Sequence, residues 1–321
     1  MRALLLEEAI GPDGLRLTTV DDPVPTPGMV LIEVHAAGVG FVDMLMTKGE
    51  YQIKPDLPFV PGAEVAGVVV EGGGLAPGTR VAATTPYNGY AELALAPEQL
   101  VFPIPAALPF DAAAGFVINY QTAHLGLKRR GRLAPGETVL VHGAGGGVGT
   151  ASIDVAQALG AGQVIAVAGG DDKQAAARAA GADLVLSPQE DWKAAVREHT
   201  GGRGADVVVD PVGGDVLAES LRCMAPEGRL LVVGFASGHI PEIKVNRLLL
   251  RHHDLVGVNY GGMLGVDPDF PAAAAREMFG WIEEGKLHPV VGTAFDLADG
   301  AEAMRAFAER RVAGKPVLLM R

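Results

Sequence analysis

The stretch that decides the fold is residues 138–162, TVLVHGAGGGVGTASIDVAQALGAG. Its first part, residues 139–141, is a short apolar run typical of a strand buried on both faces. Five glycines follow among seven residues, with the spacing Gly143-x-x-Gly146-x-x-Gly149. A helical pattern comes next and ends at Gly160, in the C′ position. Its apolar stripe is formed by Val148, Val155, Ala156 and Leu159.

A second apolar run, residues 164–167, predicts the next parallel strand. The stretch therefore reads as a βαβ unit with a glycine-rich turn at the N-terminus of its helix. Free N–H groups and the helix dipole hold a pyrophosphate at such a turn. The spacing differs from the commoner G-x-G-x-x-G, and a glycine motif can also be only a tight turn. The strand and helix around it favour a dinucleotide site.

Length and composition limit what the chain can be. Its 321 residues are enough for two domains, and a hydrophobic content of 49% fits a well-packed enzyme. A net charge of −12 argues against nucleic acid or an anionic membrane as a partner. No apolar run reaches the length of a membrane span. The single cysteine, Cys223, excludes an internal disulfide and a cysteine-rich metal site. The first residues, MRALLLEEA, predict a strand and not a signal peptide, so we expect a cytoplasmic protein.

The first hundred residues are predicted to be mostly β-structure. Short alternating runs stand between turns rich in proline and glycine, such as residues 23–28 and 72–74. The predicted strands are 2–6, 15–18, 30–36, 65–70, 80–83 and 90–94. Many short strands with frequent turns indicate a barrel-like or sandwich-like β domain.

Helices and strands alternate from residue 111 onward. The helical patterns cover 111–114, 119–127, 172–180, 192–200 and 216–224, and the strand patterns cover 184–186, 206–210, 229–234 and 255–259. Such alternation predicts a doubly wound parallel sheet. Helices at 270–284 and 300–310 and a strand at 317–320 complete the chain. We expect the ligand in a cleft between the β-rich part and the nucleotide-binding core.

Five motifs make the sequence specific. They are AGVGFVD at 37–43, PGAEVAG at 61–67, the glycine turn 143–149, DPVGG at 210–214 and GFASG at 234–238. In this order they resemble the medium-chain dehydrogenase/reductase superfamily, in particular its zinc-free quinone oxidoreductase (zeta-crystallin-like) branch. Residues 213–238 resemble most the quinone-oxidoreductase-like proteins with prostaglandin-reductase or enone-reductase activity.

The resemblance implies an α/β fold with two domains. A GroES-like β-rich domain is expected over residues 1–120, completed by 260–321, and a Rossmann-type domain with a doubly wound parallel sheet over 121–259. The resemblance also implies hydride transfer from NADPH to a quinone or an α,β-unsaturated carbonyl. A trans-2-enoyl thioester reductase shares this chemistry, and a non-catalytic nucleotide-binding protein shares the fold. Both remain alternatives.

The chain departs from the zinc-containing members of the superfamily. These use a cysteine and a His-Glu pair at the catalytic metal, and Gly40 and Ala63 stand where the cysteine and the histidine would be. A catalytic zinc needs about three converging protein ligands, so His35 and Glu64 alone are poor candidates. The resemblance therefore implies an enzyme without a metal site.

The choice between NADPH and NADH depends on the end of the second strand, about twenty residues after the glycine turn. The chain has Gly169 there instead of an acidic residue, and Lys173 resembles the family's phosphate-contacting lysine. The alternative makes Asp172 a helix N-cap and Lys173 a solvated side chain. Pro188 replaces a tyrosine that often helps to hold the phosphate. NADPH is the expected cofactor, and its implied contacts are Thr122, Gly143, Gly146, Gly147, Val148, Gly149, Lys173, Gly234, Phe235 and Asn259.

The sequence offers one candidate for substrate contact. Tyr51 matches a family tyrosine that lines the substrate cleft, and its phenol can donate a hydrogen bond, stack on the substrate or simply fill space. No proton-relay set is present, because direct hydride transfer needs only orientation and stabilisation of an oxyanion. Asp43 and Glu64 are expected to support loop backbone. By resemblance we expect a homodimer, in which the edge strand 255–259 pairs with its twin.

Overall fold

The computed structural model describes residues 1–320, and the chain forms two compact units. One unit consists of Met1–Ile118 and the chain from Val291 onward, and the other is Asn119–Val290. The division after residue 118 lies close to the expected boundary at 120. Residues 260–290, expected in the first domain, belong instead to the second unit. No helix among residues 1–320 has both the length and the apolar character needed to cross a membrane.

The second unit is built on a six-stranded parallel sheet in the order β10-β9-β8-β11-β12-β13. Its strands are β8 (Thr138–His142), β9 (Gln163–Val167), β10 (Leu184–Leu186), β11 (Ala205–Asp210), β12 (Met224–Val232) and β13 (Asp254–Gly257). In chain order this is 3-2-1-4-5-6, the strand order of a dinucleotide-binding Rossmann domain. Val139, Leu140 and Val141 of β8 have no exposed surface, which confirms a strand buried on both faces.

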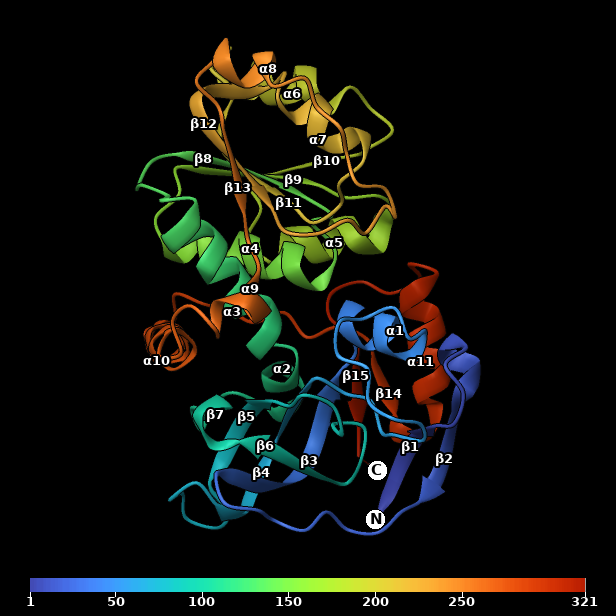
Figure 1. Ribbon diagram of the computed structural model, residues 1–321. Helices are drawn as coiled ribbons and strands as arrows, with labels where there is room; N and C mark the ends of the chain where they lie inside the picture. Colours follow the sequence, from blue (N-terminus) through green and yellow to red (C-terminus); the bar gives the residue numbers. More distant parts are fainter. Residues whose placement is uncertain (321) are drawn as a thin grey trace. The chain divides into compact units, whose positions relative to one another are not determined.

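The helices of this unit flank the sheet. They are α3 (Val117–His124, which starts in the first unit), α4 (Gly147–Ala158), α5 (Asp171–Ala179), α6 (Trp192–His199), α7 (Asp215–Ser220), α8 (Asn246–Leu249), α9 (Tyr260–Met263) and α10 (Phe270–Glu283). A π-helical turn, Leu125–Arg130, continues α3. Figure 1 shows α4 and α5 on one face of the sheet and α6 and α7 on the other. This arrangement confirms the predicted doubly wound architecture.

Helix α10 explains why residues 260–290 belong to the second unit. The centroid of the His124 ring, in α3, lies 5.8 Å from the ring centroids of both Phe270 and Trp281. His124 Nε2 also lies 2.8 Å from Glu277 Oε2. These contacts attach α10 to α3 across a sequence separation that local patterns do not reveal.

Helix α4 is buried more completely than its sequence pattern predicts. Val155 and Ala156 of the expected stripe are fully buried, whereas Val148 and Leu159 are only half-buried. Ile153, which the stripe omits, is also fully buried. The reason is that α4 contacts β8, β9 and α5 as well as the end of α3, so most of its circumference is covered.

The first unit is rich in β-structure. A larger sheet has the order β14-β15-β3-β4-β5-β7 with β6 paired to β3, and β1 and β2 form a second sheet. The strands are β1 (Arg2–Leu6), β2 (Leu15–Thr19), β3 (Met29–Gly38), β4 (Glu64–Gly72), β5 (Arg80–Thr84), β6 (Leu93–Pro97), β7 (Val101–Pro103), β14 (Ala294–Asp296) and β15 (Val317–Leu319). The helices are α1 (Phe41–Thr47), α2 (Phe110–Ala114) and α11 (Gly300–Ala308), with 3-10 turns at Gly11–Gly14, Glu98–Leu100 and Leu297–Asp299. The expected β-rich domain is therefore confirmed.

Several predicted elements are displaced. The strand expected at 90–94 begins three residues later as β6, because the Tyr90 N–H instead donates to Pro61 O at 2.9 Å. The helix expected at 216–224 ends at residue 220, because Met224 already pairs with Ala205 in the sheet. The strand expected at 255–259 ends at Gly257. Elements without a predicted counterpart are α1, α8, α9, β7 and β14.

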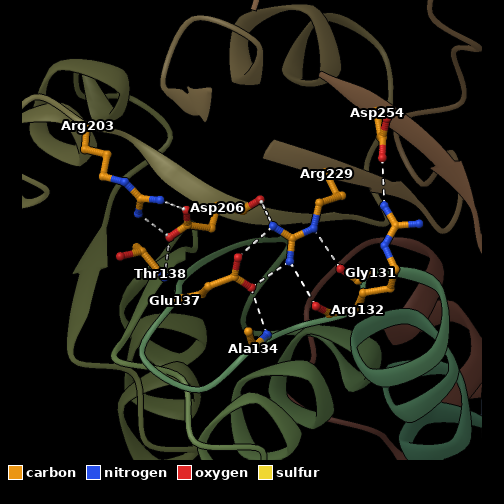
Figure 2. A network of polar contacts seen from close by, with 9 residues as sticks. All are labelled: Gly131, Arg132, Ala134, Glu137, Thr138, Arg203, Asp206, Arg229 and Asp254. Atoms are coloured by element: carbon orange, nitrogen blue, oxygen red, sulfur yellow. Dashed lines mark hydrogen bonds and ion pairs between the residues drawn. The ribbon is translucent and has the colours of Figure 1, made fainter. Parts of the chain in front are cut away.

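A network of charges joins loops at the amino ends of the parallel strands (Figure 2). Arg229 is only 9% exposed, and its guanidinium forms a bidentate ion pair with Glu137, with Nη1–Oε1 at 2.8 Å and Nη2–Oε2 at 2.6 Å. It also donates to the carbonyl oxygens of Gly131, Arg132 and Asp206. This network stabilises the edge of the sheet opposite the glycine turn.

Candidate functional site

The parallel sheet has its topological switch point between β8 and β11. Ligands of such sheets bind outside the carboxyl ends of the strands at this point. Loops at residues 143–146, 211–214 and 233–239 follow β8, β11 and β12 there. The geometry of these loops decides what the unit can bind.

The glycines of the turn after β8 differ in their surroundings. A Cβ added to Gly149 would come within 2.6 Å of backbone in the preceding turn, and one on Gly145 within 2.6 Å of Lys173 Cα. These two glycines are therefore needed for packing within the unit. A Cβ on Gly146 would meet only Gly143 O, at 3.4 Å. The turn is thus tightly packed on one side and open at Gly146.

Helix α4 begins without a side-chain cap. Its N-cap residue, Gly146, has φ −94° and ψ 174° and no side chain that could accept a hydrogen bond from the first turn. The first N–H groups of a helix lack intrahelical partners, and the helix dipole favours an anion beside them. With open space at Gly146 and donors at the start of α4, the residues present fit the pyrophosphate of a dinucleotide.

The loops after β11 and β12 lie against each other and against the glycine turn. The N–H groups of Val212 and Gly213 donate to Asp210 Oδ1 at 2.8 and 2.9 Å. A Cβ on Gly213 would lie 2.8 Å from the Phe235 ring, and one on Gly143 would lie 3.2 Å from Val212. The structure therefore brings Gly143 and Phe235 to one edge of the sheet, joined through residues 212–213.

Helix α3 contributes to the same region. Thr122, Val148 and Val233 line one narrow void, and Gly234 directly follows Val233. Two of the residues expected at the cofactor, Thr122 and Val148, thus come together from α3 and α4, beside the end of β12. Asn259 has a local role, since its Oδ1 accepts a hydrogen bond from the Gly262 N–H at 3.0 Å and caps α9.

The end of β9 carries no acidic side chain. A Cβ on Gly169 would lie 3.4 Å from Pro188, so the proline occupies the neighbouring surface. Gly170, and not Asp172, is the N-cap residue of α5. Lys173 lies in the first turn of that helix and is half-buried, while Asp172 is exposed. The alternative with Asp172 as the cap is therefore wrong.

Tyr51 lies in the first unit, half-buried against its apolar core. Burial and the negative charge of Asp43 raise the pKa of the Tyr51 phenol, so the hydroxyl is protonated at neutral pH and can donate. Asp43 itself accepts hydrogen bonds from the Gly40 and Ala63 N–H groups at 2.8 and 2.9 Å. Its carboxylate thus supports loop backbone, as expected. Burial raises the pKa of Asp43 to about 6.

A buried cation occupies the place where a ligand side chain at position 40 would be. Lys315 Nζ pairs with Glu64, and a Cβ on Gly40 would lie 2.7 Å from that nitrogen. Ala63 likewise offers no ligand atom. The residues present therefore do not fit a catalytic zinc. Among residues 1–320, no three His, Cys, Asp or Glu side chains converge as a metal ion would require.

Lys315 is the residue of this region that the sequence analysis missed. The available signal is its position two residues before the buried strand β15, where an unpaired lysine would be costly. Its partner Glu64 is fully buried, but the two residues are 251 positions apart, so their pairing cannot be seen in the sequence.

Comparisons with known proteins agree with this geometry. A protein-family model described as "Alcohol dehydrogenase GroES-like domain" matches residues 26–106, and a second family model, described as "Zinc-binding dehydrogenase", matches residues 147–279. The chain is 38% identical to a quinone oxidoreductase-like protein 2 homolog of Nematostella vectensis, over 90% of this chain and 81% of the relative.

Two solved structures are similar over nearly their whole length. A probable oxidoreductase from Mycobacterium abscessus has a TM-score of 0.90 at 43% identity, with 100% of this chain and 99% of the other covered. The quinone oxidoreductase of Thermus thermophilus, solved also in complex with NADPH, has a TM-score of 0.86 at 34% identity, with both chains covered completely. The chain therefore belongs to the quinone oxidoreductase branch of the medium-chain dehydrogenase/reductase superfamily.

Proposed function

We propose that this protein is an NADPH-dependent reductase of quinones or α,β-unsaturated carbonyls. The observation that carries the proposal is the open glycine turn at the start of α4, at the switch point of a sheet ordered 3-2-1-4-5-6. The Thermus thermophilus relative is a quinone oxidoreductase that was solved with NADPH, which supports the same cofactor here.

Different residues of the second unit hold different parts of the cofactor. Gly143 and residues 146–149 hold the pyrophosphate at the start of α4, and Lys173 donates to the 2′-phosphate. Thr122, Gly234, Phe235 and Asn259 contact the rest of the molecule. NADPH, when bound, supplies the hydride.

The substrate is oriented by Tyr51. Its pKa is raised by burial and by Asp43, so the hydroxyl stays protonated and donates a hydrogen bond to a substrate oxygen. That bond strengthens as negative charge develops on the oxygen, which is how a donor lowers the barrier. A quinone or enone accepts hydride directly, and the resulting hydroquinone anion or enolate takes up a proton from solvent, so no proton relay within the protein is required.

We also propose that the reaction needs no zinc. Gly40 and Ala63 carry no ligand atom, and the Lys315 ammonium takes up the space beside Gly40. Activity should therefore survive dialysis against a strong chelator. Stoichiometric zinc by elemental analysis, with activity lost on its removal, would contradict this.

The structure supports a thioester substrate less well than a quinone or an enone. Coenzyme A needs cations for its phosphates, and the basic run at residues 128–132 is engaged elsewhere in the unit. Lys128 pairs with Glu277, and Arg129 pairs with Asp267 at 2.6 Å. Ion pairs of this kind leave less charge for a ligand phosphate.

A homodimer formed through β13 is part of the proposal. β13 is an edge strand, and its free backbone groups can pair with a second copy. Large apolar side chains gather just before it in the chain, each between 74% and 77% exposed: Ile240, Val245, Leu249 and Leu250. Such exposure within a short segment marks an interaction surface.

We also propose that the protein is located in the cytoplasm.

The test is a turnover panel with NADPH and NADH. The substrates are 1,4-benzoquinone, 1,2-naphthoquinone, a short enone and crotonyl-CoA, and the readout is loss of nicotinamide absorbance. We expect turnover of a quinone or the enone with NADPH. Turnover of crotonyl-CoA alone would favour the thioester reductase, and NADPH binding without any turnover would favour a non-catalytic binder.

A further inference from the structure

Asp154 of α4 is a buried carboxylate that contacts the chain next to both points where it passes between the two units. The chain enters the second unit at Asn119 and leaves it after Val290. Asp154 is 4% exposed and accepts hydrogen bonds from the Tyr120 hydroxyl at 3.0 Å and from the His288 N–H at 2.9 Å. The Tyr120 hydroxyl in turn accepts from the Val290 N–H at 3.3 Å. We call Asp154, Tyr120, His288 and Val290 the Asp154 clamp.

The clamp aligns α3 with α4. Tyr120 belongs to α3 and Asp154 to α4, so the bond between them sets how one helix lies along the other. Thr122, two residues after Tyr120, lines the same void as Val148, six residues before Asp154. A shift of α3 along α4 would therefore displace Thr122 from the start of α4.

The clamp also connects the exit segment, residues 288–290, to the glycine turn. Asp154 follows Gly147 by two helical turns, or roughly 10 Å, so both lie on the same side of α4. The helix between them is buried from Gly149 to Ala156. A helix packed so completely transmits a displacement of one end to the other.

A carboxylate is a costly side chain for packing alone. Burial raises the pKa of Asp154 to about 6, while the bonds from Tyr120 and His288 lower it. An apolar residue of similar size would avoid this desolvation. What a carboxylate adds is two hydrogen bonds of defined direction, one to α3 and one to the exit segment.

We propose that Asp154 is a positioning residue for nucleotide binding, which holds α3 and the exit segment in the arrangement that places Thr122 beside the glycine turn. The inference rests on the proposed function of that turn as the NADPH site.

Two clamp variants and one control test it. Asp154→Asn keeps the shape but removes the charge and replaces one of the two acceptor oxygens by an NH2 donor, and Tyr120→Phe removes only the hydroxyl. Ile153→Val is the control, because it shortens a neighbouring side chain that is fully buried without touching the clamp. The measurements are the Kd for NADPH by fluorescence titration, the Tm, and amide hydrogen exchange at His288 and Val290.

Both clamp variants should weaken NADPH binding by about fivefold or more, equivalent to ~1 kcal/mol, and should speed exchange at the two amides. Ile153→Val should lower the Tm alone. Undiminished affinity in both clamp variants, or an equal loss in Ile153→Val, would show that the clamp only stabilises the fold. Failure of the proposed function would look different, since the wild-type protein would not bind NADPH at all, and the inference would then fall with it.

Discussion

Gly146→Val should abolish NADPH binding while leaving the protein folded. Gly146 has φ −94° and ψ 174°, a conformation that valine adopts without strain. The first added atom would meet only Gly143 O, at 3.4 Å, which is ordinary contact. The side chain would therefore find room in the protein, but in the space that we assign to the pyrophosphate.

The size of the effect follows from the donors that the side chain would block. A hydrogen bond to a charged group contributes roughly 1.5–3 kcal/mol. Loss of two such bonds at the start of α4 costs roughly 3–6 kcal/mol, which is about 10²- to 10⁴-fold in Kd. The free energy of unfolding should change by less than about 1 kcal/mol, as for an unfavourable N-cap residue.

Two other glycines serve as controls. Gly280→Val changes a glycine of α10 with nothing within 4 Å of an added Cβ, so NADPH binding should be retained. Gly149→Ala should lower the Tm strongly, because its Cβ would clash with backbone of the turn. The assay is NADPH titration beside thermal unfolding by circular dichroism. Undiminished NADPH binding by a folded Gly146→Val variant would refute the assignment of this loop.

Further changes test other parts of the molecule. Lys173→Ala should raise the KM for NADPH about five- to thirtyfold, as expected for one partly exposed charge-assisted bond of roughly 1–2 kcal/mol. The KM for NADH should stay nearly unchanged. Equal effects on both KM values would show that Lys173 does not bind the 2′-phosphate. Arg229→Leu should lower the free energy of unfolding by about 3–5 kcal/mol in urea titrations, because Glu137 would lose its buried partner. An unchanged urea midpoint of unfolding would show that the Arg229 network does not stabilise the fold. The pKa of Asp154, about 6 in the folded protein, exceeds the value of ~3.9 in an unfolded chain, so its protonation favours folding below pH 4 and this contribution is lost as the pH rises to 6. Wild-type stability should therefore fall relative to Asp154→Asn over that range, by up to about 3 kcal/mol, and a difference independent of pH would refute the raised pKa.

Local patterns sufficed for most helices and strands of the nucleotide-binding unit, but not for the short helices α8 and α9. The apolar run 139–141 forms a strand that is covered on both faces, as its composition predicts. Gly160, with φ +84°, lies at the C′ position where α4 was expected to end. The sequence pattern did not predict the burial or the bounds of an element where tertiary contacts override local preferences. α4 is buried beyond its stripe, and the strand expected at 90–94 gives way to β6 because the Tyr90 N–H bonds outside the ladder.

From spacing alone, the candidate site was predictable only in its contiguous part; Thr122, Gly234 and Phe235 were expected there by resemblance to the family. The glycine turn and Lys173 lie close together in sequence, and their identities alone suggest a phosphate site. The pairing of Lys315 with Glu64 and the bonds of Asp154 to Tyr120 and His288 join distant segments. No spacing rule links such residues, since their proximity is a product of the folded chain.

The two edges of the parallel sheet are stabilised in opposite ways, and this difference supports the proposed position of the site. At the amino edge, Arg229 forms an ion pair with Glu137 and donates hydrogen bonds to three carbonyl oxygens (Figure 2). At the carboxyl edge, the helices that follow β8 and β9 both begin with a glycine N-cap that makes no side-chain bond. Helix α6, which follows the outermost strand β10, is capped by Asp191, whose side chain accepts from the Ala194 N–H at 3.2 Å. Helix N-termini near the switch point thus keep N–H donors that no side chain of the cap accepts from, and this is why we propose that an anionic ligand binds there.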